Sequence, residues 1–552
     1  MTNKNPMHCH PDGSLKLVLW GLNLAVAVLL FFYLTAGIPL IQLGFLQNFG
    51  EGKKQYLKIS RLAVIVLGVL LPFLRWKLPN IFARLWAIRG LKRLLALPQG
   101  QMVFIFWAVY CAGMIAACWF RHLALETRAF DLGIFAQALW NTTQGHFLES
   151  SLKGGICLLG DHFSPLLALL APLYRLWPVP ESLLVLQPLI SALCFFPLAQ
   201  LAFKITGQRK TALVFCLIYF FQMPTRAALH EDFHPEVLVE PLMLWAFLWL
   251  AEGRKVLFCL ALALILSAKE NMAGVTFMLG LFAFFFKKER GGGAFWMIFS
   301  PLYLWLCVHV FIPQLSGQPY LYRGFYQELA RGGAPVLWEM LKDGERWEYL
   351  VKVFGPVLFL PLLDFPALLL TLPVLFQNLL SENPTVRSMN YHYMTGLTPF
   401  VLLASMFGLK KLDRLEWLRR RSTGLLMLLL VSALLQSGAP EYFYAWQSAG
   451  RMSARTRMIR TEMQKIPEHA VLLTHNSLIP QAINRRYVHQ FDYNDTPPKT
   501  AMALRERADY VVFDTHFWEA GTAAPEIEKE KLLKAGYGVQ FDNDGFSIFK
   551  KI

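Results

Sequence analysis

The feature that most limits the fold of this chain is its series of long apolar runs. A helix that crosses a bilayer needs about 20 predominantly apolar residues, and the first run, from Leu17 to Leu34, is close to that length. In total, 55% of the chain is hydrophobic and only 16% is charged. Soluble domains average about 45–50% apolar and about 25% charged residues. A water-soluble core cannot hold so much apolar surface, so we predict an α-helical polytopic membrane protein.

About thirteen segments are candidate spans, several of them short. They are 15–35, 59–74, 102–120, 183–203, 211–223, 237–251, 256–268, 272–286, 294–312, 351–363, 366–380, 395–409 and 423–436. The two segments that flank Asp364 could instead form one re-entrant element. The first run is long for a signal peptide and lacks a clear small-x-small cleavage site, so we expect an uncleaved span.

Clusters of basic residues predict the orientation of the spans. Lys and Arg gather at 75–93, 204–210, 287–290 and 410–421. If all candidate spans are real, these clusters share one side of the membrane, and the long or acid-bearing connections share the other. Cytoplasmic loops carry the excess of Lys and Arg, so we expect a cytoplasmic N-terminus and an extracytoplasmic C-terminal segment. The net charge of +16 then reflects topology, and we expect no nucleic acid partner.

Composition divides the chain into three expected parts. Residues 1–99 hold two spans and a basic amphipathic helix at 78–97 that we expect on the inner leaflet. Residues 100–438 form the membrane core, and 439–552 form a small soluble α/β domain. Strands of that domain are predicted at 487–491, 509–513, 537–541 and 546–549, and helices at 446–465, 499–507 and 526–535. The segment from Asp542 to Gly545 predicts a tight turn between the last two strands.

Polar residues beside membrane spans are candidates for function, and here they gather in the predicted outer loops. In the first long loop, apolar residues recur at helical spacing over 130–140, which predicts an interfacial helix with Asp131 at its start. Asp131 could cap that helix or act as an acid or base, and the sequence leaves both roles open. Asp161 and His162 follow in the same loop, before a second amphipathic run.

The next outer loop, 230–236, is short and dense in titratable groups. Its candidate metal ligands are Glu231, Asp232, His234 and Glu236. Carboxylates and imidazoles at this density bind divalent cations or transfer protons. The alternative is a solvated turn in which His234 caps a helix that begins at Pro235.

Further charged and aromatic residues with a candidate function lie in or beside the other predicted outer loops. Lys269 and Glu270 join two spans, where the alternative to function is an ion pair that closes a helix hairpin. Arg323 lies among tyrosines, and Tyr391 and His392 lie in a later outer loop. No Walker loop, G-x-S-x-G, H-E-x-x-H or dinucleotide fingerprint occurs in a fitting context, which argues against ATP-driven transport and the common soluble hydrolases.

Several segments of the chain resemble a bacterial family of predicted membrane proteins, the domain-of-unknown-function 2079 family. They are Phe130-Asp-Leu-Gly-Ile-Phe-Ala-Gln-Ala-Leu-Trp140, Asp161-His-Phe-Ser-Pro165, His234-Pro-Glu236 and Tyr391-His-Tyr393. The resemblance covers the chain from about residue 100 to its C-terminus. The layout is similar to that of the GT-C glycosyltransferases, in which a long outer loop after the first core span carries a catalytic acid. A second acidic motif commonly follows in a later outer loop, but here 230–236 is rich in histidine and lacks a strict Asp-x-Asp, which leaves metal dependence open.

The resemblance implies a membrane glycosyltransferase of the bacterial cytoplasmic (inner) membrane. It would move a sugar from a polyprenyl-phosphate-linked donor to an acceptor glycan, lipid or protein on the extracytoplasmic side. The expected catalytic residues are Asp131, Asp161 and His162. The expected substrate-binding residues are Arg128, Lys269, Glu270, Arg323, Tyr391 and His392. The four candidate ligands of the 230–236 loop would hold Mg, Mn or Zn.

The alternatives are a secondary transporter and a non-catalytic membrane scaffold. A transporter commonly binds its substrate near the bilayer midplane, between two matching repeats. In this chain the charges lie at the predicted outer rim, and no internal repeat is visible in the sequence.

Overall fold

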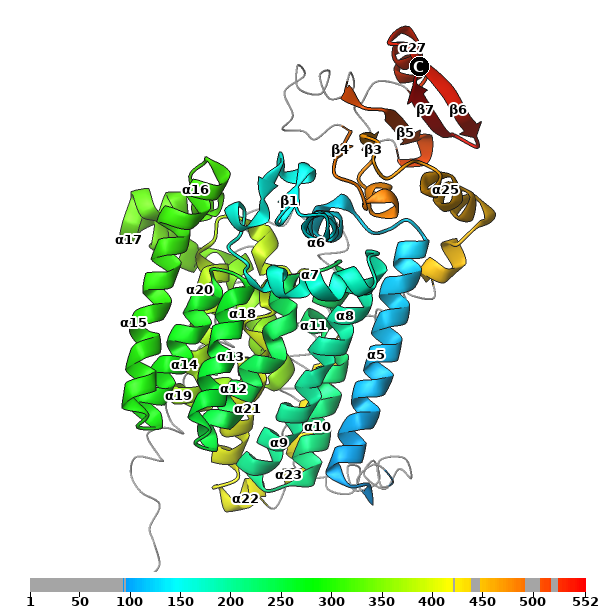
Figure 1. Cartoon of the computed structure of the whole chain (residues 1–552). Coiled ribbons are helices and arrows are strands. Elements are labelled where there is room, and N and C mark those ends of the chain that lie inside the picture. Colours follow the sequence, from blue (N-terminus) through cyan, green and yellow to red (C-terminus); the bar gives the residue numbers. More distant parts are fainter. Residues whose placement is uncertain (1–92, 94–95, 420–421, 438–446, 492–506, 518–524) are drawn as a thin grey trace, which may run out of the picture.

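The computed structural model describes residues 93, 96–419, 422–437, 447–491, 507–517 and 525–552. The predicted spans 15–35 and 59–74, and nearly all of the predicted helices 78–97 and 499–507, lie outside these residues. The described chain is mostly helical. A bundle of helices carries surface loops at one end, and a small β-sheet lies beyond those loops (Figure 1).

Three helices of the described residues are long and apolar enough to cross a membrane. They are α5 (Gln99–Leu123), the continuous helix of α8 (Glu181–Ser191) and α9 (Phe195–Thr206), and the helix that begins with α15 (Arg290–Leu306) and ends with α16 (Ile312–Ser316). A fourth would be the pair α10 (Arg209–Phe221) and α11 (Met223–His230), bent by 41°. At the bend Gln222 is extended, and Pro224 in the first turn of α11 lacks the backbone N–H that would continue the hydrogen bonds of α10.

Shorter helices fill the rest of the bundle. They are α12 (Glu240–Ala251), α13 (Lys255–Ala268), α14 (Met272–Phe286), α17 (Gln327–Lys342), α18 (Gly344–Phe354), α19 (Phe365–Leu368), α20 (Leu372–Leu380), α21 (Thr398–Leu412), α22 (Glu416–Arg419) and α23 (Ser422–Leu435). Every predicted span from 102–120 onward, except 351–363, coincides with one of these helices or of the long ones. The total of thirteen spans stays a prediction.

The predicted span 351–363 is wrong as a continuous helix. Helix α18 ends at Phe354, and two short 3₁₀ turns follow, at Gly355–Val357 and Leu360–Leu363. Between them Leu358 and Phe359 have φ of 54° and 55°. The turns begin around prolines, which cannot donate the backbone hydrogen bond that a helix interior requires. Hydropathy alone could not detect this break.

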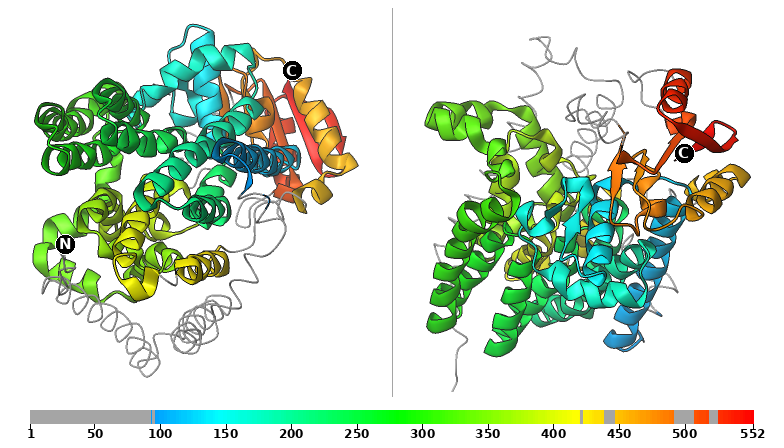
Figure 2. Two further views of the ribbon diagram at one scale, coloured as in Figure 1. Left: turned by 90° about the horizontal axis from the view of Figure 1, so that it is seen from below. Right: turned by 45° about the horizontal axis from the view of Figure 1, so that its top comes forward.

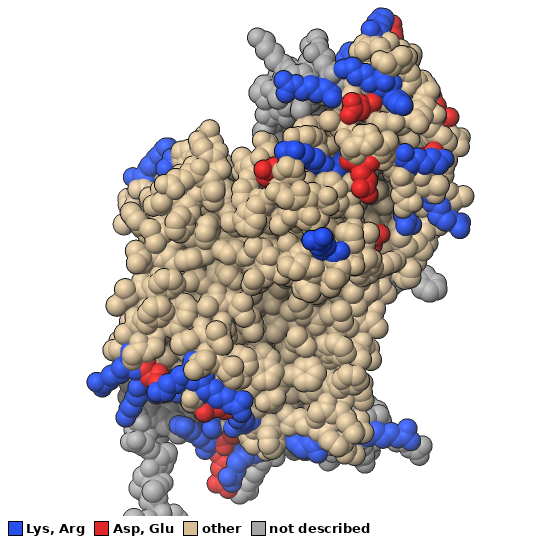
Figure 3. All heavy atoms as spheres, viewed as in Figure 1, with Lys and Arg blue, Asp and Glu red and all other residues tan. Residues whose placement is uncertain are grey.

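The basic clusters that the structure describes share one end of the bundle. Ion pairs join neighbouring connections there: Lys204 with Glu252, Lys255 with Glu289 at 2.7 Å, and Lys411 with Asp364 at 3.0 Å. Figure 3 shows Lys and Arg gathered at this end, below a broad belt of uncharged surface, and further charges at the opposite end. The described residues thus form a multi-pass membrane bundle with its charges at two ends.

The first long loop lies at the other end of the bundle and forms two helices. They are α6 (Ile134–Thr143) and α7 (Leu166–Leu176), with a hairpin of β1 (Glu149–Ser150) and β2 (Ile156–Cys157) between them. Helix α6 begins later than the apolar repeat predicts, because the backbone is not helical at Phe130 and Asp131.

The C-terminal residues form a five-stranded sheet of order β4-β3-β5-β7-β6. The strands are β3 (Leu472–Thr474), β4 (Val488–Gln490), β5 (Tyr510–Asp514), β6 (Tyr537–Asn543) and β7 (Phe546–Lys551), with helices α25 (Ala454–Gln464) and α27 (Pro525–Lys534) beside them. The four predicted strands are confirmed. The predicted turn places Asp544 and Gly545 at φ of 49° and 76°, as two-residue hairpins require.

One face of the sheet packs on the membrane bundle. Leu472 and Val512 belong to the same apolar core as the bundle helices, whereas Leu473, Val511 and Phe513 belong to a separate core on the other face. This alternation follows from the two-residue period of a strand. Figure 2 shows the sheet beside the cyan loop that follows α5, so the C-terminal residues lie at the loop end of the bundle.

Candidate active site

A cavity of about 780 Å³ opens at the loop end of the bundle. Its walls come from the first long loop, the 231–236 loop, the connection between α13 and α14, the 3₁₀ helix η8 (Leu321–Tyr326), α20 and the segment 391–396. The predicted site residues that line it are Asp131, Asp161, His162, Glu231, His234, Glu236, Lys269, Glu270, Arg323, Tyr391 and His392. The fold brings these groups together from segments that are far apart in sequence.

Asp131 has an unusual backbone conformation, with φ of 64° and ψ of −82°. These angles are near those of the classic γ-turn, which is rare and strained for an L-residue, and such strain costs about 1–3 kcal/mol. The Asp131 side chain does not cap α6, which has no side-chain cap. Its Oδ2 lies 3.3 Å from Nε2 of His234, and the side chain is 36% exposed to the cavity.

Asp232 does not join the site, contrary to its prediction as a metal ligand. It is buried, its Oδ1 lies 2.5 Å from the Arg121 guanidinium, and its Oδ2 accepts the Arg128 backbone N–H at 3.0 Å. Both carboxylate oxygens therefore bind residues that precede Asp131 in the chain, Arg121 and Arg128. The Arg128 side chain is exposed and does not line the cavity.

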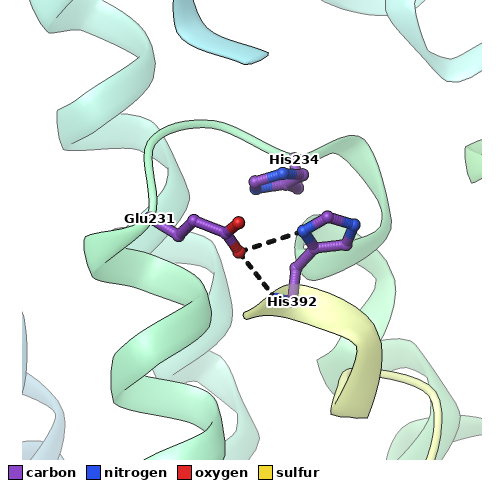
Figure 4. A group of neighbouring side chains, drawn as sticks. All are labelled: Glu231, His234 and His392. Atoms are coloured by element: carbon purple, nitrogen blue, oxygen red, sulfur yellow. Dashed lines mark hydrogen bonds and ion pairs between the residues drawn. The ribbon is translucent and has the colours of Figure 1, made fainter. Parts of the chain in front are cut away.

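Glu231, His234 and His392 form the candidate metal centre (Figure 4). Each offers one ligand atom, and these atoms lie within 4.8 Å of one another. The two imidazoles stack with ring centroids 3.7 Å apart, and Glu231 Oε2 lies 3.1 Å from His392 Nδ1. Sequence spacing identified Glu231 and His234 but assigned His392 to substrate, because only the fold brings residues 231 and 392 together.

The donor set of this centre fits a divalent ion. His234 Nδ1 is buried and has no hydrogen-bond partner among the residues that the structure describes. Buried polar atoms are nearly always paired, so an orphaned imidazole nitrogen indicates a missing ligand. Imidazoles with a carboxylate suit Zn or Mn better than Mg or Ca, which prefer oxygen ligands.

The His234–Asp131 pair is held in its charged form. Burial alone would lower the pKa of His234, but the Asp131 carboxylate outweighs it and raises this pKa to about 9. Burial alone would raise the pKa of Asp131, but His234 lowers it below its usual range. Burial, together with the charge on His234, lowers the pKa of His392. The charges around the stacked pair therefore favour a proton on His234 rather than on His392, and a divalent ion bound to these rings would displace it, because a histidine ligand is neutral.

Lys269 places a cation in the cavity wall. Its Nζ lies 3.1 Å from Glu236 Oε1, and the same oxygen is 3.6 Å from His392 Nε2. Burial alone would lower the pKa of Lys269, but Glu236 and Glu270 outweigh it and raise the pKa. The predicted hairpin ion pair therefore forms with Glu236 rather than with the adjacent Glu270.

Glu270 instead orients His162. The Glu270 carboxylate is fully buried, lies 2.8 Å from His162 Nδ1, and accepts the Tyr320 hydroxyl at 2.7 Å and the Phe163 backbone N–H at 3.0 Å. Burial alone would raise its pKa, but His162 outweighs this and lowers the pKa to about 2. Because Nδ1 is used by Glu270, Nε2 is the ring nitrogen available to the cavity. Carboxylate–imidazole pairs of this kind transfer protons.

Asp161 lies at the edge of the cavity and ties its walls together. Lys153 Nζ is 2.8 Å from Asp161 Oδ2, and the Tyr322 hydroxyl donates to Oδ1 at 3.3 Å. The Tyr322 ring also stacks on His162 at 4.1 Å. Neither Lys153 nor Tyr322 was predicted as a site residue, although the tyrosines around Arg323 were noted.

The cavity lining also includes exposed apolar side chains. Leu321 of η8 and Phe376 of α20 are 73% and 50% exposed, and both line the cavity. Arg323 is also exposed, and it lies in η8, two residues after Leu321. The cavity is therefore lined both by titratable side chains and by exposed apolar side chains, with the Arg323 cation close to Leu321.

The fold and this cavity define a class: a multi-pass membrane protein with a titratable cavity at one end of its helices. Within that class, the chain belongs to the family described as predicted membrane protein (DUF2079), whose model matches residues 121–548. No curated protein sequence matches the chain.

Two examples of solved structures are similar to the chain. They are crystal structures of ArnT from Cupriavidus metallidurans, one bound to undecaprenyl phosphate and one in the apo state. Each has 10% sequence identity and a TM-score of 0.49. The likeness covers 81% of this chain for the bound form and 82% for the apo form, and 98% of the ArnT chain in both.

Proposed function

We propose that this chain is a GT-C-type membrane glycosyltransferase. It moves a sugar from a polyprenyl-phosphate-linked donor to an acceptor outside the cytoplasm of a bacterium. In this proposal the basic end of the bundle faces the cytoplasm, and the cavity and the C-terminal sheet lie on the extracytoplasmic side of the inner membrane. The observation that carries the proposal is the cavity itself, which combines acids, imidazoles, a lysine and exposed apolar side chains.

The cavity matches the two chemical parts of such a donor. A polyprenyl tail needs apolar surface, which Leu321 and Phe376 present. The phosphate needs cations at headgroup depth, where a charge does not enter hydrocarbon. Arg323 at the mouth and Lys269 within the wall are the cations that we assign to it.

Asp131 is the base that we propose for the acceptor. The acceptor oxygen forms a bond to the anomeric carbon, the bond between that carbon and the phosphate oxygen breaks, and the phosphate leaves with the electron pair. The acceptor proton passes to the base. Asp131 is ionised at neutral pH and open to the cavity, as this step requires.

The Glu270–His162 pair is a second candidate for the base. The hydrogen bond between His162 Nδ1 and Glu270 holds the imidazole ring with Nε2 toward the cavity. An imidazole oriented in this way accepts a proton at Nε2 while the carboxylate stabilises the resulting charge.

Glu231, His234 and His392 are the residues that would hold a divalent cation. When bound there, the ion would supply Lewis-acid stabilisation of negative charge. Glu236 lies beside these ligands and is already paired with Lys269, so we assign it to the support of the ligands.

Release of polyprenyl phosphate tests the proposal directly. The purified protein in proteoliposomes would be given polyprenyl-phosphate hexoses and pentoses, with extracts of the envelope as acceptor. We expect one donor to release polyprenyl phosphate in the wild type and none to do so in the Asp131→Asn variant. The same lipid-linked sugar should accumulate in a deletion strain. Absence of both release and accumulation would favour the transporter or the scaffold.

A further inference from the structure

The C-terminal part contacts the Asp131 loop through residues 475–488, and Ser448 and Arg451 bind Glu126 earlier in that loop. The Ala129 backbone N–H lies between two acceptors of Asn476: the side-chain Oδ1 at 2.7 Å and the main-chain oxygen at 2.9 Å. Ile479, which is buried, packs against Gly133, where an added Cβ would lie 3.3 Å from Ile479 Cγ2. The contact therefore touches the chain on both sides of Asp131.

The strained turn is held from two directions. The Arg128 N–H is bound by Asp232 of the 231–236 loop, and the next N–H, that of Ala129, is bound by Asn476 of the soluble part. Asp131 follows two residues later with its φ of 64°. A conformation of this cost persists only where its surroundings hold it. The two anchors are placed to supply that restraint.

The same segment also binds the rest of the loop. Gln137 Nε2 of α6 donates to the backbone oxygens of Arg485 and Arg486 at 3.2 and 3.1 Å. The Ser151 hydroxyl donates to the Val488 oxygen at 2.7 Å and accepts the Val488 N–H at 2.9 Å. Gln137 is fully buried in this contact, and Arg485, whose backbone oxygen it binds, is buried as well, so the surface is a packed interface.

We infer that Asn476 is a positioning residue, through which the soluble C-terminal part holds the Asp131 carboxylate toward the cavity. The active site is then complete only when the sheet is docked on the loop. The catalytic consequence rests on the proposed function, but the structural anchor does not.

Asn484 provides a matched control on the same segment. Its side chain donates to the Pro178 oxygen and accepts the Tyr174 hydroxyl at 3.2 Å. These contacts join the sheet to the end of α7 and the connection that follows it, outside the cavity lining. Asn484→Ala therefore weakens docking in general without touching the Asp131 turn.

Hydrogen exchange of the full-length protein in nanodiscs tests the anchor without any substrate. Asn476→Ala removes the side-chain acceptor of the Ala129 N–H and keeps the main-chain acceptor. We therefore expect the amides of residues 129–132 to exchange about two- to fivefold faster, the lower part of the range for a lost hydrogen bond. Asn476→Asp keeps the acceptor and should exchange like the wild type, as should Asn484→Ala. Unchanged exchange in Asn476→Ala, with the protein folded, would overturn the inference.

Kinetics then test the positioning role. In Asn476→Ala we expect kcat to fall roughly tenfold and the donor KM to stay within about twofold, because the carboxylate is misplaced and donor contacts are intact. Asn476→Asp should restore kcat. Faster exchange with unchanged kcat would overturn the positioning role. A wild type that transfers no sugar from any donor would refute the proposed function, while the exchange result would still decide the anchor.

Discussion

Two aspartates near the cavity have positive φ, and they differ in what their side chains touch. Asp232, at φ of 87°, has both oxygens bound, to Arg121 and to a backbone N–H. Asp131, at φ of 64°, faces a single imidazole and the open cavity. Backbone strain at a residue whose side chain is still open to a ligand is typical of functional positions. The contrast favours a structural role for Asp232 and a chemical role for Asp131.

Asp131→Asn should remove transfer and spare the fold. Asparagine has the size and shape of aspartate and so meets the same backbone strain, and no capping bond is lost. If Asp131 accepts the acceptor proton, the rate should fall roughly a hundredfold or more. Polyprenyl phosphate release gives the rate, and thermal unfolding gives the stability. A variant that keeps wild-type turnover would move the base to His162.

Glu270 predicts how stability depends on pH. Its pKa is lowered from 4.5 to about 2, so its ionised form stabilises the fold above pH 4.5, and this contribution is lost as the pH falls toward 2. Acidification from pH 6 to pH 3 should therefore lower the Tm of the wild type more than that of Glu270→Gln. Thermal unfolding in detergent at both pH values measures the difference. Equal losses in the two proteins would mean that the Glu270–His162 pair contributes nothing to stability.

Residue types and loop positions are enough to predict most of the charged and histidine side chains that line the cavity. Membrane-adjacent acids and histidines are costly unless they are used, and this rule singled out Asp131, His162 and His234. The pairings were not predictable, because each depends on tertiary packing. Nothing in the sequence indicates that Arg121 forms an ion pair with Asp232 or that His392 contacts Glu231.

At the scale of elements, the length of an apolar run predicts where a helix forms but does not predict where a helix breaks. The predicted segments 102–120 and 183–203 appear as α5 and as the helix of α8 and α9. The segment 351–363 has similar hydropathy but breaks after Phe354, because prolines interrupt its backbone hydrogen bonds. Three elements meet at the candidate metal centre: the end of α11, the turn that follows it and the short helix at 392–394.

Metal removal should lower activity. Treatment with a chelator should reduce transfer at least about tenfold, and Mn or Zn should restore it, because the ligands include two imidazoles. Metal analysis of the purified protein should find an ion that His234→Ala and His392→Ala lose and that Asp161→Asn retains. Full activity after exhaustive chelation, with no metal in the protein, would leave the three residues as substrate contacts.

The short helix η8 and the α13–α14 connection should bind the donor phosphate. Arg323→Ala and Lys269→Ala should each weaken binding of a polyprenyl phosphate analogue by about tenfold, and Arg323→Lys should recover only part of it. Arg128→Ala is the control, because its side chain lies outside the cavity lining. Wild-type affinity in both cavity variants, or a loss in Arg128→Ala alone, would place the phosphate elsewhere.

At the scale of the whole molecule, charge divides the surface into two ends and a belt. The basic end carries the connections at 204–210, 252–255 and 287–290, and the sheet lies beyond the opposite end. The basic connections and the sheet therefore lie at opposite ends of the bundle, and which end faces the cytoplasm stays a prediction.

Reporter fusions test this orientation. An enzyme that is active only outside the cytoplasm should be active when fused after Ile552 and inactive when fused after Leu412, at the end of α21. A cytoplasmic reporter should show the reverse. If both positions reported the same side, the number of spans between them would be even, and the sheet would share its side of the membrane with the basic connection at 410–421.

The docking of the sheet on the first long loop also bears on how such proteins change during evolution. The interface joins residues 129–151 to residues 476–488, about 350 positions away, so a substitution on one side selects for a compensating one on the other. The family model spans both sides in one match, 121–548. Recombination that exchanged only the tail would break the contacts that hold Asp131. The two segments should therefore be inherited together, and their variation across the family should be correlated.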